Sequence, residues 1–200
     1  MRTRTLAVLA MIGLGGCTPD WARENNSDVL LIMEFVNGQA GGGVGAGTTQ
    51  LQSDVRTPSI INDNAELRLR SIAKNPGLTG NRDTLAVPND VILSRYTVRY
   101  YRADGRSIEG VDVPYAISGD MNTLIQADST VTTSIIVVRH QAKIEPPLRN
   151  LFSGELQSGL GGQRIVTMYA EITVYGETIS QRKVSAVGRL EIVFADYGNN

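Results

Sequence analysis

The chain has 200 residues, of which 42% are hydrophobic and 20% are charged, and it contains 21 glycines and one cysteine. This composition is typical of a globular protein and excludes a collagenous or disordered chain. A single cysteine excludes an internal disulfide, and with only one histidine beside it, too few soft ligands remain for a structural zinc site. The formal net charge of -1 provides no basic surface to neutralise phosphates, so we expect no nucleic-acid partner.

The chain begins with a leader, MRTRTLAVLAMIGLGGCTPD. Two arginines precede an apolar stretch from Leu6 to Leu14, and small residues follow before Cys17. This is the composition of a secretion signal. The apolar stretch is too short to span a bilayer, for which a helix needs about 20 residues. We therefore expect residues 1–16 to be removed.

Residues Leu14-Gly15-Gly16-Cys17 resemble the lipobox of bacterial lipoproteins. In that family the leader is cleaved before the cysteine, which receives a diacylglyceryl group and usually an N-acyl chain. The resemblance implies that Cys17 anchors the protein in a membrane and that residues 17–27 are the lipidated cysteine and a flexible tether. Because Thr18 stands where an aspartate would retain such a protein, it also implies delivery to the outer membrane. An ordinary signal peptide with an incidental cysteine is the alternative.

A single domain of short strands is predicted for residues 28–200. Their apolar residues recur with a period of two far more often than with 3.6, which indicates strands and not amphipathic helices. Asp28–Val36 contains the continuous apolar run VLLIM, and Val131–Gln141 contains the run IIVV. Such runs predict strands that are buried on both faces or lie near the centre of a sheet.

A glycine-rich stretch follows the first predicted strand. Residues 37–47 contain six glycines and no bulky side chain, which predicts a flexible loop. Gly41, Gly43 and Ala46 match the spacing G-x-G-x-x-A, and Gly42–Thr49 matches that of a phosphate-binding loop. The lysine that reaches the phosphates is missing and no apolar helix follows, so we expect no bound nucleotide.

Two strands are predicted on either side of a turn rich in Asn and Asp. Thr48–Val55 is the weaker candidate, whereas Ala65–Ala73 alternates clearly between leucines and charged residues. Between them, Asn62-Asp63-Asn64 is similar to part of the calcium linker of cadherins, although the leading aspartate of that motif is absent. A turn is the simpler interpretation, and a calcium ion at Asp63 remains an open alternative.

The segment Val91–Arg102 is β-branched and aromatic throughout and predicts a strand. It runs into Asp104-Gly105, a dipeptide that favours a type I′ hairpin turn, and Ser107–Val113 is predicted to return beside it. Asn122–Ala127 is a further, weaker strand candidate.

One face of the Val91–Arg102 strand carries Arg95, Arg99 and Tyr101. These side chains form a candidate interaction surface that would stack on sugar rings or contact a protein. Aromatic side chains that pair across an exposed sheet are also ordinary stabilisers, and this is the simpler interpretation.

A second candidate surface is the basic cluster of Arg139, His140 and Lys143, with Arg149 nearby in the sequence. It would meet an acidic partner or lipid headgroups, although such a cluster is usually a solvated rim. His140 is the only imidazole, and no nucleophile motif accompanies it, so we predict no catalytic centre.

The segment Ile144–Gly162 carries apolar residues at helical spacing, which predicts a short helix that caps one end of the domain. The last two strands, Ile165–Tyr175 and Val184–Phe194, alternate strictly and are predicted to pair as an antiparallel hairpin across Gly176–Gln181. Their predicted inward residues are Val166, Met168, Ala170, Ile172 and Val174 in the first strand, and Val184, Ala186, Leu190, Ile192 and Phe194 in the second.

About eight or nine short strands and one short helix predict an all-β fold, an antiparallel β-sandwich of immunoglobulin-like type. No pair of cysteines or core tryptophan supports an antibody-type domain.

We predict a non-catalytic, lipid-anchored protein of the cell envelope that binds a protein partner or serves as a structural component, without a cofactor or metal. One alternative is a carbohydrate- or peptidoglycan-binding module that uses Tyr101, Arg95 and Arg99 or the glycine-rich loop. The other is a hydrolase with dispersed catalytic residues. The shape of the folded surface should discriminate between them.

Overall fold

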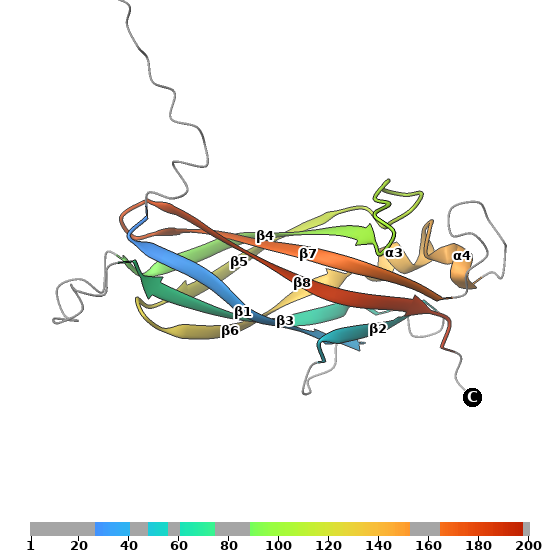
Figure 1. Cartoon of the computed structure of the whole chain (residues 1–200), viewed down its shortest axis with the longest axis horizontal. Helices are drawn as coiled ribbons and strands as arrows, with labels where there is room; N and C mark the ends of the chain where they lie inside the picture. The colour runs from blue at the N-terminus through green and yellow to red at the C-terminus, as the bar shows by residue number, and fades with distance from the viewer. Residues whose placement is uncertain (1–26, 41–47, 56–60, 75–88, 153–164, 198–200) are drawn as a thin grey trace, which may run out of the picture.

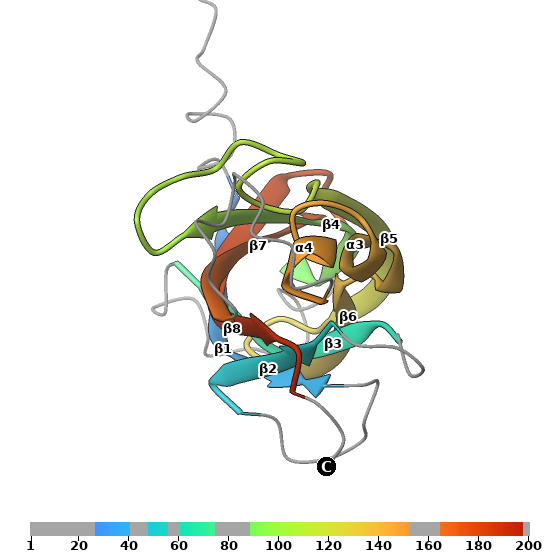
Figure 2. The same ribbon diagram turned by 90° about the vertical axis from the view of Figure 1, so that its right-hand side faces the viewer.

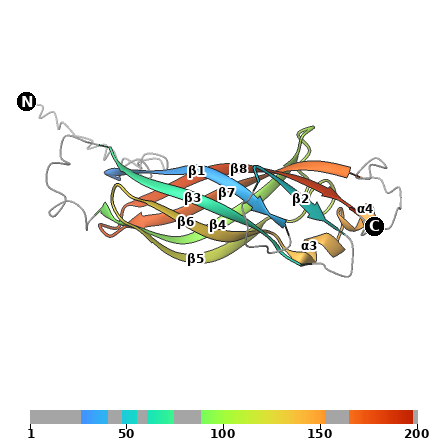
Figure 3. The same ribbon diagram turned by 90° about the horizontal axis from the view of Figure 1, so that it is seen from below.

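The computed structural model describes residues 27–40, 48–55, 61–74, 89–152 and 165–197. The strands are β1 (Val29–Gln39), β2 (Gln50–Asp54), β3 (Asp63–Ala73), β4 (Val91–Arg102), β5 (Ile117–Ile125), β6 (Thr130–Val138), β7 (Ile165–Thr178) and β8 (Lys183–Ala195), and the helices are α3 (His140–Ile144) and α4 (Arg149–Phe152). The strands form two facing sheets of order β1-β3-β6 and β2-β8-β7-β4-β5 (Figure 1, Figure 3).

The strand order is that of an immunoglobulin-like sandwich. In that fold strands A, B and E share one sheet and strands G, F and C share the other. Here β1, β3 and β6 occupy the positions of A, B and E, and β8, β7 and β4 occupy those of G, F and C. All paired neighbours are antiparallel except β2, which runs parallel to β8. The predicted fold class is therefore confirmed.

One hydrophobic core fills the space between the two sheets. The inward faces predicted for β7 and β8 are confirmed, since every residue predicted to point inward is buried. Leu67 and Leu69 of β3 are fully buried as well. β7 and β8 pair as the predicted antiparallel hairpin. Strict alternation was a reliable signal here because a strand places every second side chain on the same face.

β1 and β6 are edge strands, so the prediction that they are buried on both faces or central is wrong. Each pairs with β3 on one side only. On their outer faces, apolar residues such as Leu30 and Ile136 stay exposed or half-buried. β6 also ends at Val138, because α3 begins at His140. An apolar run therefore shows that both faces are hydrophobic, and not that both are covered.

β1 also packs against β8 across the edge of the sandwich, where the two lie side by side (Figure 2). A Cβ atom on Gly188 would lie 2.2 Å from Sδ of Met33 and 2.8 Å from Cγ2 of Val36. Only glycine leaves room for β1 at this point. Gly188 occupies an inward position in the alternation of β8 and has this packing role.

The predicted hairpin after β4 is wrong. Residues 107–113 belong to a loop with a turn at residues 110–112, and the antiparallel neighbours of β4 are β7 and β5, of which β5 overlaps the weaker candidate Asn122–Ala127. Gly105 has a φ of +85°, but Asp104 does not have a positive φ. A type I′ turn requires positive φ at both residues, so the turn that closes with the hydrogen bond from Gly105 N–H to Arg102 O is of another type.

The predicted helical cap is present at one end of the sandwich and contains α4, whereas α3 ends at Ile144, where the predicted segment begins (Figure 2). Pro146-Pro147 separates them, and proline has no N–H with which to continue a helix. Leu148 and Leu151 are buried against the core as the spacing predicted. The rest of the predicted helix, residues 153–162, lies outside the described residues.

The two ends of the sandwich have different contents. The turn end holds the start of β1 and the β5–β6 and β7–β8 connections, and the helix end holds α3, α4 and the connection Ala103–Ala116 (Figure 1). β4 runs from one end to the other over 12 residues, which at about 3.3 Å per residue separates the two ends by about 40 Å. Whatever precedes residue 27 therefore joins the domain at the turn end.

Candidate functional site

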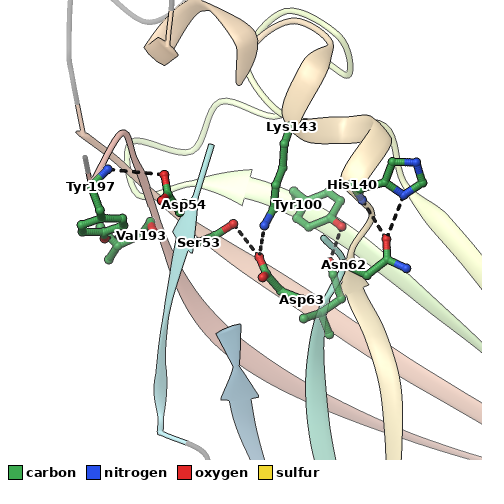
Figure 4. Close-up of polar contacts among 10 residues, drawn as sticks. Ser53, Asp54, Asn62, Asp63, Tyr100, His140, Lys143, Val193 and Tyr197 are labelled. Atoms are coloured by element: carbon green, nitrogen blue, oxygen red, sulfur yellow. Dashed lines mark hydrogen bonds and ion pairs between the residues drawn. The ribbon is translucent and has the colours of Figure 1, made fainter. Parts of the chain in front are cut away.

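Lys143 is buried, and the predicted basic surface cluster is wrong for this residue. Its side chain is 2% exposed, and its Nζ lies 2.9 Å from Oδ2 of Asp63, whose side chain is 1% exposed (Figure 4). The lysine lies inside because it has a buried carboxylate as its partner. Arg139, His140 and Arg149 are exposed at the helix end.

Asp63 connects three elements of the fold. Ser53 of β2 donates a hydrogen bond of 2.6 Å from its Oγ to the same Oδ2 that pairs with Lys143 of α3. All three side chains are buried, so the cluster is closed to a substrate. A buried ion pair is strongly destabilised when one partner is removed. The cluster therefore holds β2, β3 and α3 together.

The calcium alternative at Asp63 receives no support from this arrangement. The carboxylate binds an ammonium group where a cation would have to sit, and calcium prefers six to eight oxygen ligands. Among the residues that the structure describes, no group of three or more His, Cys, Asp or Glu side chains comes together to hold a metal ion. Asp63 instead begins β3 as part of the buried cluster.

Two tyrosines of β4 link the five-stranded sheet to β6. The hydroxyl of Tyr100 donates a hydrogen bond to the backbone oxygen of Val137. Tyr96 has a backbone hydrogen bond with Ile136. Burial raises the pKa of both phenols above the usual value of 10.0, because a buried phenolate would lose its hydration. Both phenols are therefore neutral at ordinary pH, and their hydrogen bonds connect the two sheets.

His140 is exposed at the start of α3 and contacts Asn62. Its backbone N–H donates a 2.8 Å hydrogen bond to Oδ1 of Asn62, and its ring Nδ1 lies 3.2 Å from the same oxygen. Asn62 thus satisfies one of the backbone donors at the start of the helix, a role that suits asparagine. Part of the Asn/Asp segment that predicted a turn has this capping function.

Arg95, Arg99 and Tyr101 lie on the outer face of the five-stranded sheet, as predicted. The ring of Tyr101 stacks on that of Tyr169, with 5.5 Å between the ring centres. The guanidinium of Arg189 lies 5.6 Å from the centre of the Tyr101 ring and pairs with Glu171 at 3.2 Å. Tyr101 is therefore already engaged by neighbours of its own sheet.

The other two arginines of this face have similar partners. The guanidinium of Arg95 lies 4.8 Å from the centre of the Tyr175 ring, which is a cation–π distance. Arg99 lies opposite Glu171 in the register of β4 and β7. The face is a ladder of cross-strand pairs, the simpler of the two predicted interpretations.

The connection Ala103–Ala116 is a compact, hydrogen-bonded loop. The backbone N–H groups of Val111, Asp112 and Val113 all donate to the oxygen of Ile108. In return, Ile108 N–H donates to Oδ2 of Asp112 at 3.3 Å. Val113 is fully buried and attaches the loop to the core. These contacts fix the loop although it belongs to neither sheet.

This loop presents three large apolar side chains to solvent. Ile108, Val111 and Tyr115 are 52–63% exposed, and we call them the apolar loop residues. The Tyr115 ring lies against the backbone of Gly110, which leaves no room for a Cβ. This feature was not predicted from the sequence, because Ser107–Val113 was assigned to a strand. The glycines at 105 and 110 and the proline at 114 were the available signal for a loop.

Two predicted features lie outside the described residues. These are Cys17 with its leader and residues 18–26 of its tether, and residues 41–47 of the glycine-rich stretch. The start of that stretch, Asn37–Gln39, belongs to β1. In the described part of the chain, no helix has both the length and the apolar character needed to span a membrane.

The chain matches no family model and no curated protein. It is similar to the solved structure of the periplasmic chaperone SfaE, at 14% identity and a TM-score of 0.28, over 82% of this chain and 58% of that one. It is also similar to the putative ApaA protein from Bordetella pertussis, at 11% identity and a TM-score of 0.29, over 86% of this chain and 96% of that one. The chain thus spans less than two thirds of the chaperone's length. Both TM-scores are too low to support an argument about function, and the fold assignment rests on the strand order.

Proposed function

We propose that this chain is a non-catalytic, lipid-anchored protein of the cell envelope whose β-sandwich binds a protein partner. The anchor is supported by the resemblance of Leu14-Gly15-Gly16-Cys17 to a lipobox. The outer membrane is the proposed location, because Thr18 follows the cysteine. The observation that carries the binding function is the ordered loop with its exposed Ile108, Val111 and Tyr115.

The apolar loop residues support binding because their exposure is unfavourable in water. Single exposed apolar residues are common, whereas a contiguous group on a monomer often marks a contact surface. The three belong to one short connection whose backbone is fixed by hydrogen bonds to Ile108 and by the burial of Val113. Little conformational entropy would therefore be lost when a partner covers them.

The position of the loop is consistent with such a role. An anchor on Cys17 would join the domain at the turn end, whereas the loop lies at the helix end, about 40 Å away along the strands. The sandwich would then act as a spacer that presents Ile108, Val111 and Tyr115 away from the membrane. Loops at the end of a rigid sandwich are common binding surfaces.

A carbohydrate-binding function is less well supported than protein binding. Sugar rings would need an uncovered aromatic face, and on the predicted surface Arg189 lies over Tyr101 and Arg95 lies over Tyr175. The buried cluster around Asp63 is closed to a substrate, so it provides no argument for a hydrolase.

Site-specific cross-linking in intact cells tests the partner. A photoreactive amino acid at Val111 should cross-link to one defined envelope protein. The same group at Val187, which is 56% exposed on the outer face of β8, is the matched control and should not. Replacement of Ile108 and Tyr115 by serine should abolish the adduct from position 111. Equal labelling from positions 111 and 187 would contradict the proposed surface.

The anchor is tested separately by metabolic labelling with a radioactive fatty acid. The natural chain should incorporate the label, and Cys17→Ala should not. Label that persists in the Cys17→Ala variant would disprove the anchor and leave the binding surface untouched.

A further inference from the structure

The turn end carries exposed apolar residues on the outer faces of both sheets. Ile92 of β4 and Leu124 of β5 lie opposite each other in the strand register. Ile179 directly follows β7, and Leu30 is the second residue of β1. All four side chains are 40–53% exposed, and we call them the apolar rim. They surround the end of the sandwich at which the chain enters the domain.

The backbone around the apolar rim is held by hydrogen bonds between different connections. Ile179 N–H donates to the oxygen of Asp90 at 3.0 Å, directly before β4. Lys74 N–H donates to the oxygen of Asp28 at 2.9 Å, close to Leu30. The rim therefore has a defined shape that belongs to the fold of the turn end.

The charges at the turn end nearly balance. Among the residues that the structure describes at this end, the exposed cations are Lys74, Arg182 and Lys183, and the carboxylates are Asp28, Asp90, Asp128 and Glu177. Two of these carboxylates have structural partners, because Asp90 accepts a hydrogen bond from Ala127 N–H and Asp128 accepts one from Ala73 N–H. Because these described residues carry no excess of positive charge, they provide no strong attraction to anionic lipids. The contact that this end offers to a bilayer is therefore apolar.

The path of the chain determines what lies opposite the rim. Only residues 18–26 separate Cys17 from Ser27, and even a fully extended tether between them spans no more than about 35 Å. Ser27 lies beside β1 at the turn end, and its Oγ accepts a hydrogen bond from Val29 N–H at 3.2 Å. Acyl chains on Cys17 would therefore hold the turn end within about 35 Å of the bilayer surface, and the turn end is the end that can reach it.

We infer that the apolar rim of Leu30, Ile92, Leu124 and Ile179 rests in the interface of the bilayer that holds the acyl chains of Cys17. The inference depends on the proposed lipid anchor. Exposed aliphatic side chains gain by entering the boundary between headgroups and acyl chains, and an anchored protein needs only a weak contact. The sandwich then stands on its turn end and directs the apolar loop residues away from the membrane.

The test uses the full lipidated chain in vesicles of zwitterionic phosphatidylcholine. Because the only natural cysteine carries the lipid, a cysteine introduced by Leu124→Cys is the only free thiol and accepts a nitroxide spin label. At a membrane interface, this label should be more accessible to dissolved oxygen than to a water-soluble nickel chelate. Val187→Cys is the matched control, since Val187 has a similar exposure but is the fifth residue of β8, away from the rim on the outer face of the sheet, and it should show the opposite preference.

The outcomes separate the inference from the proposed function. Equal accessibility at positions 124 and 187, in a chain whose intact mass shows the acyl groups, would overturn the rim and leave the anchor standing. A chain without acyl groups would overturn the anchor itself. The preference at position 124 should also persist between about 50 mM and about 500 mM salt, a range over which charge attraction is strongly screened. Loss of the preference at high salt would show that cations and not the rim carry the contact.

Discussion

The turn end and the helix end of the sandwich are closed by different chemistry. At the turn end, short connections satisfy their own backbone groups, as in the hydrogen bonds from Ser129 N–H to Gln126 O and from Gln181 N–H to Thr178 O. At the helix end, closure depends on buried side chains, above all on Lys143 and Asp63. The turn end is therefore closed mainly by hydrogen bonds of exposed or partly buried connections, and the helix end by a buried ion pair. We expect substitutions to be more damaging at the helix end.

The largest effect is expected for Lys143→Met, which removes one partner of the buried ion pair. Asp63 would remain buried without its ammonium partner, and such a change costs about 3–5 kcal/mol of unfolding free energy. Urea denaturation measures the loss. The double variant Lys143→Met with Asp63→Leu is the control and should recover much of it, because a pair of apolar residues needs no charge compensation. If Lys143→Met alone is as stable as the natural chain, the ion pair does not close the helix end.

A smaller effect is expected for Tyr100→Phe, which leaves the oxygen of Val137 without its donor. Loss of one buried hydrogen bond costs about 1–3 kcal/mol. The variant should also change the response to alkali. Burial raises the pKa of Tyr100 above 10.0, so its contribution to stability is complete below pH 10 and is lost as the pH rises further, when the unfolded chain ionises first. Stability of Tyr100→Phe should fall less steeply above pH 10, and identical pH profiles would contradict the assignment.

The matching substitution at the turn end is Asp90→Ala. It removes the hydrogen bond that Oδ1 accepts from Ala127 N–H at 2.8 Å. Because this contact is only partly buried, water can replace it, and we expect a loss of about 1 kcal/mol. Thermal denaturation of this variant beside Lys143→Met measures the difference between the two ends directly. Comparable losses of stability in Asp90→Ala and Lys143→Met would contradict the proposed difference between the turn end and the helix end.

The smallest effect on stability is expected for Ile108→Ser and Val111→Ser. Both side chains are mostly exposed, and substitutions at such positions usually change stability by less than about 0.5 kcal/mol. The same variants should nevertheless abolish the cross-link to the partner. Unchanged denaturation curves with lost cross-linking would assign these residues to binding, whereas a large loss of stability would show that they serve the fold.

The sequence predicted the strands best where alternation was strict. β7 and β8 appeared with the predicted inward residues and pairing, and β4 appeared with the predicted bounds Val91–Arg102. The prediction was wrong for Ser107–Val113, whose apolar residues belong to an ordered loop. Alternation decides where a strand faces, but apolar content alone does not distinguish a strand from a loop fixed by side-chain and backbone hydrogen bonds.

The candidate site was likewise predicted only in part from the sequence. Arg95, Arg99 and Tyr101 lie on the outer face that the period of two assigned to them, although their cross-strand partners became visible only in the register of the sheet. Lys143 was predicted on the surface because it lies in a local basic cluster of the sequence with Arg139 and His140. Its burial depends on Asp63 and Ser53, which belong to other elements.

The sequence alone determined that this chain is an all-β sandwich and which faces of its regular strands point inward, because these properties follow from local periodicity. It also contains the motif on which the proposed anchor at Cys17 rests. Only the tertiary structure decided which strands lie at the edges, that Lys143 is buried, and that Ile108, Val111 and Tyr115 share one exposed loop. These properties depend on contacts between residues far apart in the chain, and no local pattern in the sequence encodes them.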